Sequence, residues 1–247
     1  MNSQVEIIAH RGGRWPGVSE NTLEAFTAAH RAGAAWMETD VHASADGVLF
    51  AAHDADLDRI AARPHCIRDL NAAELDSIEL SAGGRLPRLT ALVESLPDVS
   101  WNIDVKAAHS VAPMIRVVRS LQVEDRIRLA SFSSSTLRRL REALPGVRTS
   151  TGVAETALFA LRGLPGVPDS GPCPLPARLD ALQAPMSFKG IPVVTREFVA
   201  RAHRAGLQVH VWTINDLASM RRLLDLEVDG IVTDEVLLGL RELSGWT

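Results

Sequence analysis

Short apolar runs of β-forming residues recur along the chain, and most are followed by a segment whose apolar positions have helical spacing. Eight such runs can be counted when one hairpin strand is set aside. A repeated alternation of strand and helix implies an α/β fold with a parallel sheet, and eight units in about 250 residues predict a closed (β/α)8 barrel. The predicted strands are residues 5–9, 35–37, 99–105, 128–130, 147–151, 181–184, 208–212 and 230–233.

An open, doubly wound sheet is the alternative to the closed barrel. Sheets of that kind bind dinucleotides through a GxGxxG turn after the first strand. No such turn follows residues 5–9, so the sequence favours the barrel.

The first predicted helix begins at a capping signal. Asn21 is expected to be its N-cap, and Glu24 stands three residues later, as a capping box requires. Gly33 marks its end. Its apolar stripe consists of Leu23, Phe26 and Ala29. Further helices are predicted over residues 89–96, 133–143, 195–205 and 216–224.

The alternation is interrupted after the second strand. Asp46-Gly47 is typical of a hairpin turn, and residues 48–52 form a predicted strand after it. Residues 54–88 then form an irregular insertion with one short helix at 72–77. The Pro/Gly-rich stretch at 164–178 is interpreted as a surface loop. We therefore expect one barrel domain over residues 1–247, with an insertion at about 54–88.

Composition narrows the classes of function. The chain has 247 residues, a formal net charge of −4 and a pI of about 6.1. We therefore expect no nucleic-acid binding, and no stable membrane insertion because the first apolar run is too short to span a bilayer. Two cysteines, Cys66 and Cys173, are too few for a disulfide framework. The N-terminal segment lacks a signal-peptide pattern, which favours a cytoplasmic location.

Carboxylates stand at the ends of the second and third barrel strands. Glu38 and Asp40 are two residues apart, so a regular strand would point both to one face. Asp104 is placed similarly on the next barrel strand. Carboxylates held close repel one another unless a cation lies between them, and oxygen ligands suit Mg²⁺ or Ca²⁺. The sequence predicts a divalent-cation site formed by Glu38, Asp40 and Asp104.

Two histidines stand beside the same strand ends. His10 ends the first strand and His53 follows the hairpin, and imidazole transfers protons near neutral pH. Arg11 offers a fork of donors that matches phosphate, and Lys106 adds a point charge. Together these groups favour cleavage of a phosphodiester. The remaining histidines are interpreted as structural or solvated: His30, His42, His65, His109, His203 and His210.

At this point the ordered segments of the chain resemble the glycerophosphodiester phosphodiesterase family. No single segment is specific, but the set occurs in the family's order over nearly the whole chain. The segments are HRGG (10–13), SENT (19–22), LEAF (23–26), ETD (38–40), HD (53–54), NIDVK (102–106), VHVWTIND (209–216) and VDGIVTD (228–234).

The resemblance implies a (β/α)8 barrel with a small insertion after the hairpin. It also implies metal-dependent hydrolysis of glycerophosphodiesters to glycerol 3-phosphate and an alcohol, with Mg²⁺ or Ca²⁺ as cofactor. His10 and His53 would be the acid–base pair, and Glu38 and Asp40 metal ligands. The implied substrate-binding residues are Arg11, Lys106 and Trp212, the last as a wall on the glycerol side.

Two departures from the family pattern bear on the site. Ser19 stands where the family usually has proline, which is expected to loosen the turn before the first helix. Asp104 stands where the family usually has glutamate. Its carboxylate falls short by about one bond length, roughly 1 Å or more, so it would bind the cation through water or accept a larger ion.

Two other interpretations stay open. A lyase of the phospholipase D-like toxin type shares the barrel and the histidine pair but stops at a cyclic phosphate. Such proteins are secreted and have a disulfide, which fits this sequence less well. A barrel that binds a phosphodiester without cleaving it is the second interpretation, and the intact histidine pair disfavours it. The sequence indicates no particular alcohol and no oligomeric state.

Overall fold

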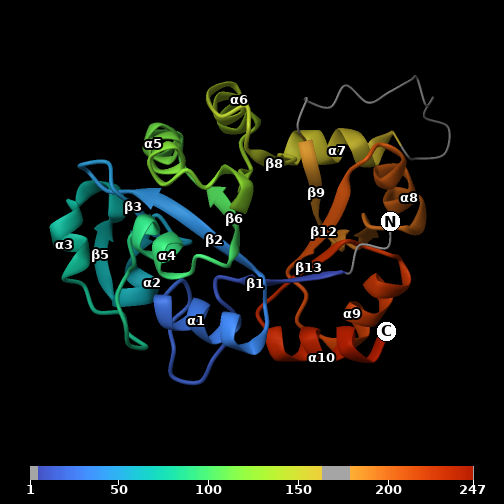
Figure 1. Cartoon of the computed structure of the whole chain (residues 1–247), viewed down its shortest axis with the longest axis horizontal. Helices are drawn as coiled ribbons and strands as arrows, with labels where there is room; N and C mark the ends of the chain where they lie inside the picture. Colours follow the sequence, from blue (N-terminus) through green and yellow to red (C-terminus); the bar gives the residue numbers. More distant parts are fainter. Residues whose placement is uncertain (1–4, 163–178, 247) are drawn as a thin grey trace.

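Parallel strands close into a barrel in the computed structural model, which describes residues 5–162 and 179–246. In this described part the main sheet has nine strands, and the eight parallel ones close because β1 pairs with both β13 and β2 (Figure 1). The predicted (β/α)8 barrel is thus confirmed. The barrel strands are β1 Glu6–His10, β2 Trp36–Ala43, β6 Ser100–Val105, β7 Ile127–Ala130, β8 Arg148–Ser150, β9 Leu179–Pro185, β12 Gln208–Trp212 and β13 Gly230–Thr233.

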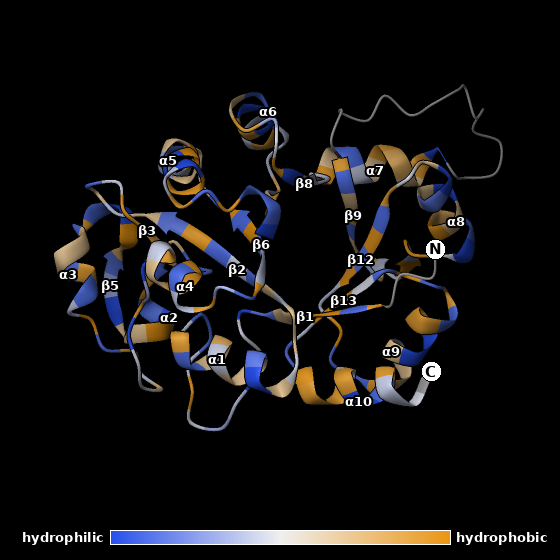
Figure 2. Ribbon diagram, viewed as in Figure 1, coloured by the Kyte–Doolittle hydropathy of each residue, from blue (hydrophilic) through white to orange (hydrophobic). Residues whose placement is uncertain are grey.

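Helices surround the strands, and several of them turn an apolar stripe toward the sheet. In α5, for example, Val111, Met114 and Val118 are buried at spacings of three and four residues. Figure 2 shows hydrophobic and hydrophilic segments alternating along the helical ribbons. The sequence prediction did not include α5, α7 or α10. The outer helices are α1 Leu23–Ala32, α4 Leu89–Ser95, α5 Val111–Leu121, α6 Ser134–Ala143, α7 Val153–Leu161, α8 Arg196–Arg204, α9 Leu217–Asp225 and α10 Val236–Trp246.

The start of α1 differs from the prediction by one residue. Thr22 is the N-cap, and its side chain accepts a hydrogen bond from Ala25 N at 3.2 Å, so the predicted cap at Asn21 is wrong. Asn21 instead has a φ of +56° and is buried, and its Oδ1 accepts a hydrogen bond from Thr39 Oγ1 at 2.8 Å. Asparagine tolerates this left-handed conformation. Its hydrogen bond with Thr39 ties the turn before α1 to β2. Gly33 caps the other end, as predicted.

The insertion is more regular than predicted. Strand β3 Leu49–Ala51 pairs antiparallel with β2, and the hairpin strands β4 Asp56–Leu57 and β5 Arg63–Cys66 follow. The prediction of a single helix is wrong, because α2 Asp58–Ala61 precedes α3 Ala72–Asp76, with the short 3-10 turn η1 Ile67–Asp69 between them. The insertion has its own apolar cluster, which includes Phe50, Leu57, Ile67 and Leu75. This cluster holds the insertion as a compact unit at one side of the barrel.

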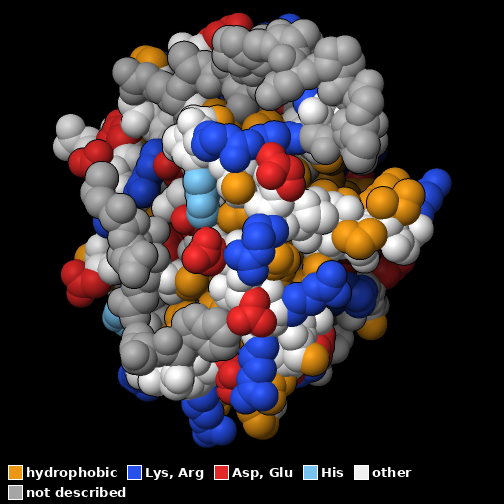
Figure 3. Space-filling view, turned by 90° about the vertical axis from the view of Figure 1, so that its right-hand side faces the viewer, with side chains coloured by type: hydrophobic (Ala, Val, Ile, Leu, Met, Phe, Trp, Pro, Cys, Tyr) orange, Lys and Arg blue, Asp and Glu red, His pale blue; other side chains and the backbone are white. Residues whose placement is uncertain are grey.

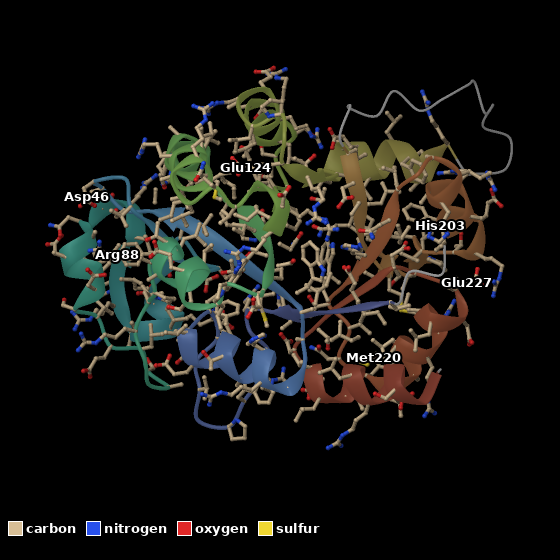
Figure 4. The ribbon with its side chains drawn as sticks, viewed as in Figure 1. Asp46, Arg88, Glu124, His203, Met220 and Glu227 are labelled. Atoms are coloured by element: carbon tan, nitrogen blue, oxygen red, sulfur yellow. The ribbon has the colours of Figure 1, made fainter. Side chains whose placement is uncertain are left out.

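Side chains from the strands fill the middle of the barrel (Figure 4). His203 lies on the outer side of the molecule in the same view, where its Nε2 is 2.8 Å from Asp229 Oδ2. On the face that Figure 3 shows, basic and acidic side chains are interspersed. Cys66 is a free thiol, while Cys173 and the predicted loop at 164–178 lie outside the described residues. None of the helices in the described ranges is both long and apolar enough to cross a membrane.

Candidate active site

A cavity of about 570 Å³ opens at the C-terminal ends of the barrel strands, the face that carries the active site in barrels of this kind. Every residue that the sequence predicted for the site lines this one cavity. They are His10, Arg11, Glu38, Asp40, His53, Asp104, Lys106 and Trp212.

His10 is the last residue of β1, which places its ring at the rim of the cavity. Its Nδ1 lies 2.7 Å from Asp234 Oδ1, directly after β13, and its Nε2 lies 3.9 Å from Glu38 Oε2. Burial disfavours protonation of the ring, but the hydrogen bond to Asp234 and the charge of Glu38 outweigh it and raise the pKa of His10. Asp234 therefore fixes the ring orientation and its tautomer.

His53 reaches the cavity from the hairpin. Because β3 runs antiparallel to β2, the chain after it passes beside Asp40, whose carbonyl accepts a hydrogen bond from Ala52 N at 2.9 Å. His53 Nδ1 lies 2.8 Å from Asp54 Oδ1. The ring of His42 is buried, which lowers its pKa and keeps it neutral, and its Nε2 donates to the carbonyl of His53 at 3.1 Å. His42 thus has the structural role predicted for it.

An ion-pair network joins His53 to Arg11 through the insertion. Arg59, in α2, donates from Nε to Asp54 Oδ2 at 2.6 Å and from Nη2 to Glu20 Oε1 at 2.7 Å. The same oxygen of Glu20 accepts a hydrogen bond from Arg11 Nη1 at 3.1 Å. One side chain of the insertion therefore links the carboxylate that orients His53 to the carboxylate that holds Arg11.

Three carboxylates lie side by side on neighbouring strands. Glu38 and Asp40 are on β2, and Asp104 is opposite Asp40 on β6. Burial and the charge of Asp40 raise the pKa of Glu38 to about 8, and burial raises the pKa of Asp104 despite the nearby Lys106. In the described part of the chain, Asp40 Oδ2 and Asp104 Oδ1 are buried without a hydrogen-bond partner. Arg11 Nε lies 3.2 Å from Asp40 Oδ2 and Lys106 lies between Asp40 and Asp104, so two cations stand against the three carboxylates.

Lys106 places its ammonium between two of these carboxylates. Its Nζ lies 2.7 Å from Asp40 Oδ1 and 2.7 Å from Asp104 Oδ2. Within residues 5–162 and 179–246, no group of three or more His, Cys, Asp or Glu side chains is arranged to hold a metal ion. The oxygen donors themselves fit a hard divalent cation, since they are carboxylates and Asp104 Oδ1 is buried without a hydrogen-bond partner among the described residues. Lys106 Nζ occupies the space between Asp40 Oδ1 and Asp104 Oδ2, so a cation bound by these two oxygens would take its place.

Trp212 forms an apolar wall of the cavity. It is the last residue of β12 and packs edge-on against Phe132, with ring centroids 5.8 Å apart. Lys106 Nζ lies 5.2 Å from the ring centroid of Phe132, within range of a cation–π contact. The aromatic pair therefore borders directly on the charged cluster.

The backbone conformation after His10 favours glycine at position 12. Arg11 has a φ of +51°, and its N–H donates to the carbonyl of Glu38 at 2.9 Å. At Gly12 the φ is +86°, and a Cβ there would lie 2.7 Å from the Cβ of Ala25. A larger residue at Gly12 would push α1 away from the cavity rim.

Ser19 adds a contact that proline could not make. Its Oγ donates to the carbonyl of Gly83 at 2.8 Å, and its own carbonyl accepts a hydrogen bond from Thr22 Oγ1 at 2.8 Å. The turn before α1 is thereby tied to the insertion.

Several residues that position the side chains of the site were not predicted from the sequence. Asp54 and Asp234 were inside segments of the resemblance, and their positions beside a histidine and after a strand were usable signals. Glu20 was also inside such a segment, SENT (19–22). Arg59 carried no such signal, because it lies 39 residues from Glu20 and the two meet only in the folded chain.

Comparison with known proteins identifies the family. Residues 10–238 match the sequence model of the glycerophosphoryl diester phosphodiesterase family. The chain is 35% identical over 229 residues to the Mycobacterium tuberculosis protein named "Probable glycerophosphodiester phosphodiesterase 2", covering 92% of this chain and 86% of that one. It is 28% identical over 260 residues to a glycerophosphodiester phosphodiesterase of Caldanaerobacter subterraneus, covering 97% and 98% of the two chains.

A solved structure of this family is also similar to the chain. The crystal structure of glycerophosphodiester phosphodiesterase from Agrobacterium tumefaciens is similar with a TM-score of 0.75 and 26% identity, covering 96% of this chain and 99% of that one. The family match spans both histidines, the carboxylates and Asp234. The chain belongs to the glycerophosphoryl diester phosphodiesterase family, whose members are phosphoric diester hydrolases.

Proposed function

We propose that the hydrolysis of glycerophosphodiesters by this protein depends on His10 and His53 as the proton-transfer pair and on a divalent cation, Mg²⁺ or Ca²⁺. The observation that carries the proposal is the matched environment of the two rings. Each has Nδ1 beside a carboxylate, Asp234 for His10 and Asp54 for His53, and both line the cavity that contains the acidic cluster.

With Nδ1 bound to a carboxylate, each ring has Nε2 available for the substrate. One histidine takes a proton from the attacking water, whose oxygen forms the new P–O bond, and the other gives a proton to the departing alkoxide. The P–O bond to the alcohol breaks as the new one forms, so the products are glycerol 3-phosphate and the alcohol. The unequal environments of the rings, with His10 the more buried and His53 the more exposed, supply two distinct positions for these roles.

Arg11 and Lys106 are proposed to hold the phosphate oxygens, and Trp212 to contact the glycerol. The Arg11 guanidinium offers a planar set of donors and is held in place by Glu20. Lys106 supplies an ammonium beside Asp104. The flat ring of Trp212 offers an apolar face to the glycerol carbons.

Glu38, Asp40 and Asp104 would hold the cation, because they present the buried carboxylate oxygens that Mg²⁺ and Ca²⁺ prefer. A bound cation supplies charge neutralisation and orients the phosphodiester. Asp104 Oδ1, which is buried without a hydrogen-bond partner among the described residues, supports this assignment.

Phosphorus NMR tests the proposal. Glycerophosphocholine, glycerophosphoethanolamine and glycerophosphoglycerol are each incubated with the protein in Mg²⁺, Ca²⁺ or chelator. We expect glycerol 3-phosphate with a divalent cation, and loss of turnover in chelator. A cyclic phosphate as the final product would assign the protein as a lyase. Binding without turnover in every metal would assign a phosphodiester-binding barrel.

A further inference from the structure

The cavity has an apolar extension that the chemistry of a glycerophosphodiester does not use. It leads from the charged cluster to α7 and to the hairpin of β10 Ser187–Phe188 and β11 Ile191–Pro192, which follows β9. We call it the apolar arm. Its lining side chains include Phe132, Val153, Ala157, Leu161, Phe188 and Val193.

The side chains of the apolar arm are unusually exposed for their size. Four large ones, Phe132, Val153, Leu161 and Phe188, each have more than half of their surface exposed. In the described part of the chain, eight large hydrophobic side chains are exposed, and these four all line one cavity. Isolated exposed apolar residues are normal, but a contiguous group of them marks a binding surface.

The position of α7 makes the arm continuous with the catalytic centre. In Figure 1, α7 is seen lengthwise, whereas α5 and α6 are seen end-on, so α7 runs in a different direction from its neighbours. The cavity contacts α7 from Val153 at its first residue to Leu161 at its last. One cavity therefore joins a polar end, with Arg11 and Lys106, to an apolar strip along a whole helix.

A cavity with one charged end and one apolar arm matches an amphiphile. A deacylated glycerophosphodiester is polar at both ends, so it would leave the arm facing water. The volume of about 570 Å³ falls within the range of pockets that enclose drug-sized ligands. A hydrocarbon chain would bury the exposed side chains of the arm, which is favourable in proportion to the area covered.

We propose that the preferred substrates are glycerophosphodiesters that carry one long hydrocarbon chain, and that the chain binds in the apolar arm. This inference rests on the proposed function, because the phosphodiester must lie at the charged end. Water adds across the P–O bond to the alcohol in either of two arrangements. A chain esterified to the glycerol stays on the glycerol phosphate, whereas a chain that forms the alcohol leaves as a fatty alcohol.

The first experiment measures kcat/KM of the unmodified protein for three substrates below their micelle concentrations. They are glycerophosphocholine, its octanoyl-glycerol derivative and glycerophospho-octanol. We expect at least one chain-bearing substrate to exceed glycerophosphocholine by about tenfold or more, rising with chain length. The preferred chain-bearing substrate identifies which side of the phosphate enters the arm. Equal or lower kcat/KM for both would overturn the inference, whereas no turnover of any substrate would contradict the proposed function itself.

The second experiment uses the double variant Phe188→Ser/Leu161→Ser. Both side chains are exposed, so the change removes apolar surface from the arm without opening the core. We expect the ratio of kcat/KM for the chain-bearing over the deacylated substrate to fall about tenfold. The matched control is Leu23→Ser/Leu237→Ser, which changes two exposed leucines of α1 and α10 outside the cavity, and it should keep the ratio.

Binding to phosphatidylcholine vesicles completes the test. If the double variant loses vesicle binding but keeps the substrate ratio, the arm is a membrane-docking surface and the inference is wrong. An unchanged ratio together with unchanged vesicle binding also overturns it.

Discussion

The two ends of the barrel both bury charge, but they differ in the sign of the clustered charge and in whether it lines the cavity. At the C-terminal end, Glu38, Asp40 and Asp104 crowd together, and two of their buried oxygens have no hydrogen-bond partner among the described residues. At the N-terminal end, the guanidinium of Arg128 is fully buried and bonded along most of its edge. The first arrangement presents carboxylate oxygens to the cavity, whereas the second surrounds one guanidinium with partners away from that cavity.

The N-terminal end is built from the first residues of several strands. Arg128, second in β7, donates from Nε to Asp180 Oδ2 at 2.8 Å and from Nη2 to Gln208 Oε1 at 2.7 Å. Its guanidinium carbon lies 4.4 Å from the ring centroid of Trp36, and Nη1 lies 3.3 Å from Nδ1 of His210. Partners from three strands, β2, β9 and β12, therefore converge on one cation of β7.

The comparison separates two uses of buried charge. A buried ion whose donors are all paired can fix the register of the strands around it, and its removal leaves unpaired groups behind. A buried cluster with unpaired oxygens is costly unless a ligand completes it, and such clusters gather at functional sites. Changes at the C-terminal end should therefore affect rate, and changes at the N-terminal end should affect stability.

The largest expected effect is on rate, from a change at the C-terminal end. His10→Asn should lower kcat/KM about a thousandfold, because it removes a proton-transfer group. The free energy of unfolding should change by less than about 1 kcal/mol, since the ring is at the cavity rim. Steady-state kinetics and urea unfolding measure the two quantities. His30→Asn in α1, outside the cavity, is the matched control. Normal turnover by the His10 variant would show that His10 is not needed for proton transfer.

The next effect is on stability, from the opposite end. Arg128→Leu should lower the free energy of unfolding by about 3–5 kcal/mol, because Asp180 and Gln208 lose their buried partner. The folded protein should keep its kcat/KM within about twofold, since the site is at the other end of the barrel. Arg222→Leu, an exposed change on α9, should cost less than about 0.5 kcal/mol in the same urea experiment. A large loss of activity in folded Arg128→Leu would contradict the prediction that the N-terminal end of the barrel affects stability but not rate.

A smaller effect depends on pH. Burial and the neighbouring Arg128 hold the pKa of His210 well below its usual value, so the ring stays neutral in the folded protein. Below about pH 6.5 the unfolded chain binds a proton there that the folded one does not, so stability falls as pH falls. His210→Asn cannot bind that proton. The stability of the wild type relative to this variant should therefore fall by about 2 kcal/mol from pH 7 to pH 5.

Urea unfolding of the wild type and the His210 variant at the two pH values provides the measurement. Parallel pH profiles would mean that His210 titrates normally in the folded protein.

The smallest effect concerns the insertion. Arg59→Met should lower kcat/KM about tenfold, because Asp54 and Glu20 lose the side chain that holds them in place beside His53 and Arg11. Arg63→Met, an exposed change in β5, is the matched control. Kinetics with glycerophosphocholine measure the effect. If both variants behave alike, the network does not position the catalytic groups.

The sequence predicted the barrel and the polar ends of its strands well, because both depend on local pattern. His10 ends β1 and Asp104 is the last residue but one of β6, and parallel strands bring such ends together. The prediction that Glu38 and Asp40 end the second strand is wrong, because β2 continues to Ala43 to pair with β3. The cap of α1 was misplaced by one residue because Asn21 and Thr22 are both good caps, and only the contact of Asn21 with Thr39 separates them.

Long-range contacts account for most of what was not predicted. The links through Arg59 depend on how the insertion folds against the barrel, which no spacing in the sequence encodes. The helix α7 was not predicted because apolar residues lie on both its buried and its exposed sides, so it lacks the stripe that identifies an outer helix. The exposed apolar residues of α7 also form a wall of the apolar arm.

The hydrogen bond between His10 and Asp234 joins residues 224 positions apart in the chain. During synthesis, His10 leaves the ribosome early, but its orienting partner arrives only with the last barrel strand. The hydrogen bond that orients the ring therefore cannot form until β13 is available to pair with β1. Contacts of such high sequence separation fold slowly, so a growing chain should stay inactive until the barrel is complete.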